Sequence, residues 1–172
     1  ERDQLLAEGH QLLPMRWVEV DKNESKRVPG GDPVPWKLKS RLVARGDLEK
    51  KEVRSDSPTC DMEAQNLIFS FAAANKCVIR SADITNAYFQ GQLLSRVLLF
   101  RPPKGGLPGV PEDAILRARV PVYGTRDAGR GFWKKLRNSI IGAGMEENKI
   151  FPALYSYSIG GRCVAMLGTH VD

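Results

Sequence analysis

Segments rich in proline and glycine divide this chain into short pieces and so limit what it can fold into. Residues 28–35 (VPGGDPVP) cannot hold regular structure. Residues 101–112 contain four of the 11 prolines and three of the 16 glycines. The pair Gly160-Gly161 is typical of a hairpin turn. Short strands and short helices are therefore expected, and the sequence contains no internal repeat.

The apolar pattern predicts an interleaved set of such elements. A helix is expected over about 62–75, begun by Asp61, because its apolar residues recur at helical spacing. A second, amphipathic helix is expected after residue 126. Predicted strands cover 15–20, 36–44, 77–82, 97–100, 115–122, 153–158 and 162–167, with a short helix at 85–90. The first two strands and the last two should form hairpins, which favours an α+β fold with an antiparallel sheet and packed helices.

Positive charge is concentrated in one part of the chain. Residues 117–137 carry seven basic residues and one acid, which accounts for the whole formal net charge of +6. Arg126, Arg130, Lys134 and Arg137 fall on one side of the predicted helix, and Phe132, Leu136 and Ile140 fall on another. A cationic stripe of this kind suits a polyanion such as nucleic acid, although a solvated helix face has the same pattern.

Several classes of protein are disfavoured. No apolar run approaches the roughly 18–20 residues that span a bilayer, so no membrane partner is expected. Three widely spaced cysteines and two histidines do not supply a structural zinc site, and free thiols are expected.

Two carboxylates have positions that suggest a metal site. Asp83 is the only acid between Glu63 and Glu112, and it follows the apolar run 77–79. Asp172 also follows an apolar stretch. Acids at the ends of neighbouring strands would suit Mg²⁺, which prefers carboxylate and phosphate oxygens. A helix or turn cap is the alternative for Asp83, and spacing alone does not show that the two acids meet.

Seven short strings follow one another along the chain: 40–46 (SRLVARG), 57–58 (SP), 82–91 (ADITNAYFQG), 101–105 (RPPKG), 123–136 (YGTRDAGRGFWKKL), 154–155 (LY) and 170–172 (HVD). In this order they resemble motifs of the reverse transcriptase of Ty1/copia-type long-terminal-repeat retrotransposons, over roughly residues 15–172. The corresponding family motifs are K-x-R-L-V-A-[KR]-G, S-P, D-V-K-T-A-F-L-N-G, Q-P-P-G-F, L-Y-G-L-K-Q-A-P-R-A-W-Y-E-K-L, C-L-Y and Y-V-D-D.

The resemblance implies a right-hand polymerase with fingers at about 12–75 and 97–122 and a partial palm at about 76–96 and 123–172. It also implies two Mg²⁺ or Mn²⁺ ions, an RNA or DNA template–primer, deoxynucleoside triphosphates and the remainder of a Pol polyprotein in a cytoplasmic particle. The site residues it implies are Asp83 and Asp172 as catalytic metal ligands, the carbonyl of Ile84 beside them, Lys39 (or Lys37) and Arg41 at the triphosphate, Ala87, Tyr88 and Asp127 at the nucleotide, and Arg126, Arg130, Lys134 and Arg137 at nucleic acid.

The sequence departs from the family pattern at several positions. Asp127 replaces a glutamine, Gly129 a proline and His170 a tyrosine, and the second acid of Y-V-D-D would be residue 173. Thumb and RNase H segments are absent from these residues. We therefore expect these 172 residues alone to be catalytically inactive. Two alternatives remain: a decayed copy that keeps only a basic nucleic-acid-binding surface, and a structural domain whose charge is simply solvated.

Overall fold

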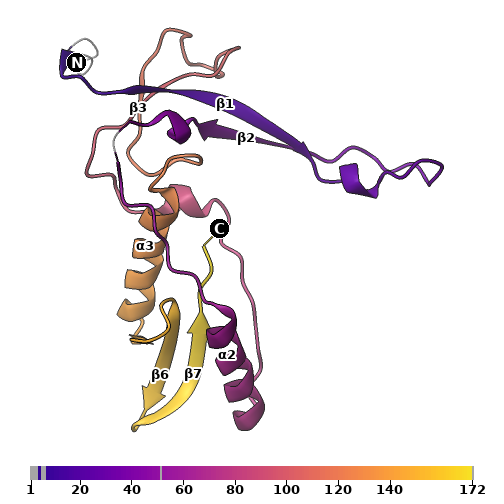
Figure 1. Cartoon of the computed structure of the whole chain (residues 1–172), viewed down its shortest axis with the longest axis vertical. Coiled ribbons are helices and arrows are strands. Elements are labelled where there is room, and N and C mark those ends of the chain that lie inside the picture. The colour runs from indigo at the N-terminus through magenta and orange to yellow at the C-terminus, as the bar shows by residue number, and fades with distance from the viewer. Residues whose placement is uncertain (1–3, 5–6, 51, 172) are drawn as a thin grey trace.

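The computed structural model describes residues 4, 7–50 and 52–171, and it has an α+β architecture with two separate sheets (Figure 1). The larger sheet has the strand order β2-β1-β3-β4 and the smaller one β5-β6-β7. The strands are β1 (Leu12–Asp21), β2 (Leu38–Ala44), β3 (Leu99–Arg101), β4 (Leu116–Arg117), β5 (Glu146–Glu147), β6 (Leu154–Ile159) and β7 (Arg162–Gly168). The helices are α2 (Met62–Asn75) and α3 (Ala128–Gly142), with 3-10 turns η1 (Glu24–Lys26), η2 (Gly46–Leu48) and η3 (Ala87–Gln90).

The predicted N-terminal hairpin is confirmed. β1 and β2 pair antiparallel from Met15 opposite Ala44 to Asp21 opposite Leu38, and the hairpin projects far from the rest of the molecule (Figure 1). The base of β1 also pairs with β3 in parallel, with Leu12 opposite Leu99. The larger sheet is therefore mixed rather than antiparallel as expected, whereas both strand pairs of the smaller sheet are antiparallel. The parallel pair is possible because a long connection containing α2 separates the two strands.

Helix α2 begins and ends as the sequence indicated. The Asp61 side chain accepts a hydrogen bond from the Ala64 backbone N–H at 2.8 Å, which satisfies one of the free donors of the first turn. Lys76 ends the helix in the left-handed conformation. The helix packs against the smaller sheet through a core of Cys60, Ala64 and Leu154. No helix in the described part of the chain is long and apolar enough to cross a bilayer.

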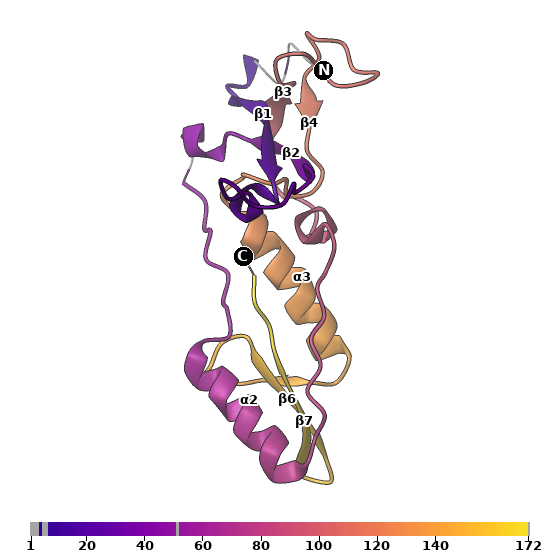
Figure 2. The ribbon, with the colours of Figure 1, turned by 90° about the vertical axis from the view of Figure 1, so that its right-hand side faces the viewer.

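Helix α3 lies between the two sheets (Figure 2). Phe132 and Ile140 are buried, as the amphipathic pattern predicted. The chain continues through β5 into the β6–β7 hairpin, which turns at Gly160-Gly161 and confirms the second predicted hairpin.

Two predicted strands are not formed as expected. Residues 77–82 have no strand partner, and Val78 and Ile79 are 81% and 53% exposed. A strand needs a neighbour for its N–H and C=O groups, and no described segment pairs with this one. The strand predicted at 115–122 shortens to β4 for the same reason, since β3 offers only a short edge. The predicted helix at 85–90 is the 3-10 turn η3.

The larger sheet is joined to the segment before α3 by a close backbone contact, the 44–46/123–124 junction. Ala44 N–H donates to the Tyr123 carbonyl at 2.7 Å, and Gly46 N–H donates to the Gly124 carbonyl at 3.1 Å. A Cβ atom on Gly124 would lie 2.2 Å from the Ala44 carbonyl oxygen, and its φ of +86° is left-handed. Only glycine fits there without moving one of the two segments.

We predict that Gly124→Ala destabilises the protein by about 2 kcal/mol or more, because strain and a backbone clash act together. Equilibrium unfolding in urea measures the loss. Gly142→Ala is the matched control, because a Cβ atom there meets nothing within 4 Å and φ is not positive. Equal stability of the two variants would show that the junction tolerates a side chain.

Candidate functional site

Asp83 lies on the extended segment between α2 and η3, and both it and the following Ile84 are exposed. A carboxylate and a neighbouring backbone carbonyl are the oxygen donors that Mg²⁺ prefers, so the pair fits such an ion by its chemistry. Within residues 4, 7–50 and 52–171, no three His, Cys, Asp or Glu side chains gather as a metal cluster. Asp172, the other predicted ligand, lies outside the described residues.

The β1–β2 hairpin brings positive charge near Asp83. The pKa of Lys39 is lowered, first by the like charge of Arg41, then by Lys22 and by desolvation. The Asp83 carboxylate acts on Lys39 in the opposite direction, which shows that it lies within electrostatic reach of this lysine. Lys39 and Asp83 are 44 positions apart in the sequence, and the resemblance assigns both to the nucleotide site.

The strand register explains why these cations act on one another. Val18 lies opposite Arg41 and Val20 opposite Lys39, so alternate residues on both strands share one face. We call this the cationic face of the hairpin; its members are Arg16, Lys22, Lys37, Lys39 and Arg41. All five are exposed, and among the described carboxylates none forms an ion pair with them. Repulsion between unpaired cations favours the binding of an anion.

The end of the described chain is fixed beside α2. Val171 is 8% exposed, and its N–H donates to the Thr59 hydroxyl at 3.3 Å. Cys60 N–H donates to the Thr169 carbonyl at 2.8 Å. The segment that carries the HVD string is therefore anchored up to Val171 by the residues that precede α2.

Tyr88 and Ala87 lie on η3, and both are half-buried. The Tyr88 ring is tilted against Tyr123 with centroids 4.8 Å apart, and Phe89 meets the same ring edge-on at 5.3 Å. Tyr123 is part of the 44–46/123–124 junction, so the rings of Tyr88 and Phe89 pack against a residue of this junction. The turn that carries Tyr88 is positioned by the same contact that holds the hairpin.

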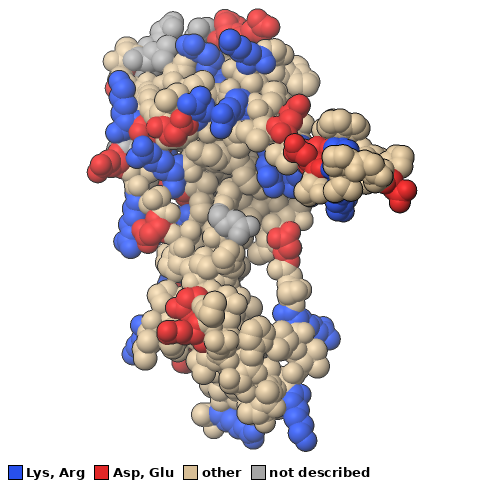
Figure 3. Space-filling view, turned by 45° about the vertical axis from the view of Figure 1, so that its right-hand side comes forward, with Lys and Arg blue, Asp and Glu red and all other residues tan. Residues whose placement is uncertain are grey.

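The basic residues in α3 and just before it do not form a uniform solvated stripe. Arg130 pairs with Asp56 at 2.7 Å, and Arg137 pairs with Glu147 at 2.7 Å. Arg126 donates to the Gly46 carbonyl at 3.2 Å while remaining exposed, and Lys134 is exposed. Internal carboxylates therefore compensate half of the predicted nucleic-acid-binding set. On the face in Figure 3, Lys and Arg mix with Asp and Glu over the upper part of the molecule.

Three largely buried charged side chains form a network that the sequence did not reveal. Arg96 donates to both oxygens of Asp127 at 2.9 Å and also pairs with Glu49. The side chains of Arg96, Asp127 and Glu49 are 15%, 18% and 4% exposed. Burial alone would lower the pKa of Arg96, but hydrogen bonds to the two carboxylates outweigh it and raise the pKa. Asp127, predicted at the nucleotide, is thus held by an arginine.

No pattern in the sequence pairs Arg96 with its partners, which lie 47 and 31 positions away. The one usable signal was the acid at position 127, where the family pattern has a glutamine. A buried acid needs a nearby cation, so this departure indicated that a compensating residue exists without showing which one.

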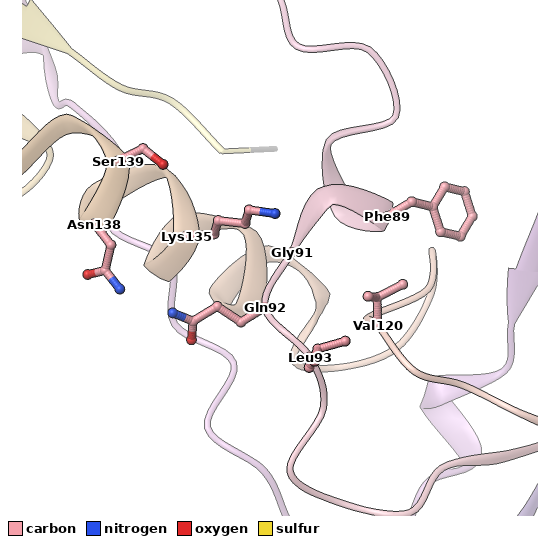
Figure 4. Close-up of a pocket in the computed structure, with 8 residues that line it drawn as sticks. All are labelled: Phe89, Gly91, Gln92, Leu93, Val120, Lys135, Asn138 and Ser139. Carbon is pink, nitrogen blue, oxygen red and sulfur yellow. The ribbon is translucent and has the colours of Figure 1, made fainter. Parts of the chain in front are cut away.

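An open hollow of about 620 Å³ lies between the residues after η3 and helix α3 (Figure 4). It is lined by Phe89, Gly91, Gln92, Leu93, Val120, Lys135, Asn138 and Ser139. Lys135 is the only charged residue of this lining, and the site residues predicted from the sequence are not among those that form it.

Comparison with known proteins identifies relatives. The family model described as reverse transcriptase (RNA-dependent DNA polymerase) matches residues 5–172. The retrovirus-related Pol polyproteins from transposons RE2 and RE1 of Arabidopsis thaliana are each 26% identical over 164 residues, 94% of this chain. The corresponding polyprotein from transposon TNT 1-94 of Nicotiana tabacum is 26% identical over 133 residues, 76% of this chain. The chain spans 10–11% of the length of these relatives. No solved structure matches.

We predict that Arg96→Met destabilises the fold by about 3–5 kcal/mol, because it leaves two buried carboxylates without a cation. Urea unfolding at pH 7 measures the change. Arg45→Met is the control: it removes an exposed pair with Asp47 and should cost less than about 1 kcal/mol. If the two variants unfold alike, the Arg96 network contributes no more than a surface ion pair.

Proposed function

The chain belongs to the reverse transcriptase (RNA-dependent DNA polymerase) family, and from this membership we propose that it forms the fingers and part of the palm of a copia-type retrotransposon polymerase. The fingers would comprise about 12–75 and 97–122, and the palm about 76–96 and 123–172. The projecting β1–β2 hairpin and the separate β5–β7 sheet support this division. The polymerase would be one part of a longer Pol polyprotein.

The proposed reaction extends a primer by one deoxynucleotide on an RNA or DNA template. The primer 3′-hydroxyl oxygen attacks the α-phosphorus of a deoxynucleoside triphosphate, the bond to the β-phosphate breaks, and pyrophosphate leaves with the proton released from the hydroxyl. The observation that supports the proposal is that Lys39 and Arg41 lie on one face of β2, with the Asp83 carboxylate close enough to act on the charge of Lys39. A triphosphate needs cations, and its reacting end needs carboxylate-held metal.

Lys39 and Arg41 would bind the phosphates, with Arg41 able to form two parallel hydrogen bonds to phosphate oxygens. Asp83, the Ile84 carbonyl and Asp172 would hold divalent metal ions, Mg²⁺ or Mn²⁺, which when bound supply charge neutralisation and a more acidic attacking hydroxyl. Removal of any of these donors would be expected to abolish most activity, and these 172 residues include only the first acid of the Y-V-D-D pair.

Tyr88 would lie under the sugar of the incoming nucleotide and exclude a 2′-hydroxyl by contact, with Ala87 lining the same pocket. Its ring is braced by Tyr123, which supports a rigid steric filter. Asp127 would lie near the nucleotide with its charge partly offset by Arg96, which it shares with Glu49.

We predict that template–primer binding by the 172-residue chain weakens steeply as the salt concentration rises. We also predict that Arg41→Gln weakens the Mg²⁺-dependent binding of a deoxynucleoside triphosphate about tenfold, because one charge-assisted contact to the phosphates is lost. Fluorescence anisotropy and calorimetry give the two affinities. Arg162→Gln, an exposed arginine at the far β6–β7 turn, is the matched control. An equal loss in both variants would mean that only net charge matters, as in the decayed-copy and solvated-charge alternatives.

We predict that Asp83→Asn removes nucleotide-dependent Mn²⁺ binding, measured by electron paramagnetic resonance, without a change in melting temperature, because Asp83 is exposed. Asp32→Asn, in the exposed loop at the end of the hairpin, should leave Mn²⁺ binding intact. Retained Mn²⁺ binding in the Asp83 variant would contradict its role as a metal ligand.

A further inference from the structure

The end of the β1–β2 hairpin presents a large aromatic ring to solvent. Trp36 lies two residues before the start of β2 and is 73% exposed, which is unusual for the largest apolar side chain. One side of its ring is covered by the Arg27 guanidinium, whose carbon lies 4.1 Å from the ring centroid. A cation at this distance is attracted to the ring face and fixes the orientation of the ring.

Arg27 is itself held in place by the loop. Its Nε donates to the Val34 carbonyl at 3.0 Å, and its Nη2 donates to the Pro35 carbonyl at 3.3 Å. It also forms an ion pair with Asp21, whose side chain is only 5% exposed. The guanidinium beneath Trp36 is therefore anchored to the end of β1 and to the residues just before the ring.

Asp21 joins the two ends of the loop. Its carboxylate accepts hydrogen bonds from the N–H groups of Asn23 at 3.0 Å and Lys37 at 2.9 Å. Burial alone would raise the pKa of Asp21, but the hydrogen bond from Arg27 and these two N–H groups outweigh it, so the pKa lies below its usual value. The charged form of Asp21 thus keeps a proline- and glycine-rich loop in one arrangement.

The cationic face runs along the same strand. Lys37 follows Trp36 directly, and Lys39 and Arg41 continue along β2, which is the open edge strand of the larger sheet. A polynucleotide that crosses this edge meets cations suited to its phosphates on one side and a fixed aromatic ring on the other. Aromatic rings that hold stacked bases beside backbone-binding cations are the usual means of binding single strands.

We propose that Trp36 is a stacking platform for an unpaired base of a single-stranded nucleic acid whose phosphates lie on the cationic face of the hairpin. The inference rests on the proposed function and adds a subsite to it, at the loop end of the hairpin. Arg27 is the positioning residue, because it holds the ring from below and leaves the other side open to a base.

The test compares three ligands with the 172-residue chain: an oligothymidylate, an abasic oligomer of equal length and charge, and a blunt duplex. We expect Trp36→Leu to weaken oligothymidylate binding about fivefold or more, which is the lower end for one lost stacked base. Binding of the abasic oligomer and the duplex should stay unchanged. Trp36→Phe, which keeps an aromatic face, should restore most of the affinity.

Trp17→Leu is the matched control, because this tryptophan lies on the same hairpin and is 45% exposed, but none of the cations that the structure describes stacks on it. It should bind oligothymidylate like the parent chain. If Trp36→Leu binds all three ligands like the parent, the stacking platform is overturned while the proposed function stands. If the parent binds no nucleic acid in a salt-dependent way, both fail together.

Discussion

The arrangement of this protein depends on a short contact between two backbone segments that are almost eighty residues apart. At the 44–46/123–124 junction, hydrogen bonds of 2.7 and 3.1 Å join the base of the hairpin to the residues that lead into α3. The Tyr123 ring at this junction packs against the Tyr88 ring of η3, and Arg126 donates a hydrogen bond to the Gly46 carbonyl. Hairpin, aromatic turn and basic helix therefore share one point of attachment.

Charge is used in two different ways around this point. In the Arg96 network, one arginine pairs with two carboxylates inside the protein and holds three segments together, so its charge is unavailable to a ligand. On the cationic face, charges are exposed, mutually repelling and unpaired by any described carboxylate. Total positive charge in a window of sequence therefore did not identify the surface on which exposed cations lack described carboxylate partners. Carboxylates pair with some of the basic residues around α3. The hairpin contributes less to the net charge, but the cations on its cationic face are exposed and have no carboxylate partner among the described residues.

Local features of the sequence predicted local structure well. The Asp61 cap, the apolar spacing after it and the Gly160-Gly161 turn each act over a few residues, and each element formed where it was predicted. The strand predicted at 77–82 failed because its apolar residues describe only a preference, whereas a strand also needs a partner. The parallel pairing of β1 with β3 was likewise beyond a local pattern, since it depends on how a long connection returns.

The sequence by itself determined the family, the two hairpins, both helices and the identity of Asp83, Lys39, Arg41 and Tyr88 as candidate site residues, because motifs and periodicities are written in neighbouring positions. Only the tertiary structure decided which charges are free and which are compensated. It placed Asp127 and Arg130 in internal pairs and fixed Trp36 over Arg27 at the end of the hairpin. The physical reason is that electrostatic compensation depends on the distance between charges in space. The spacing of two residues along the chain does not show whether the fold brings them into contact.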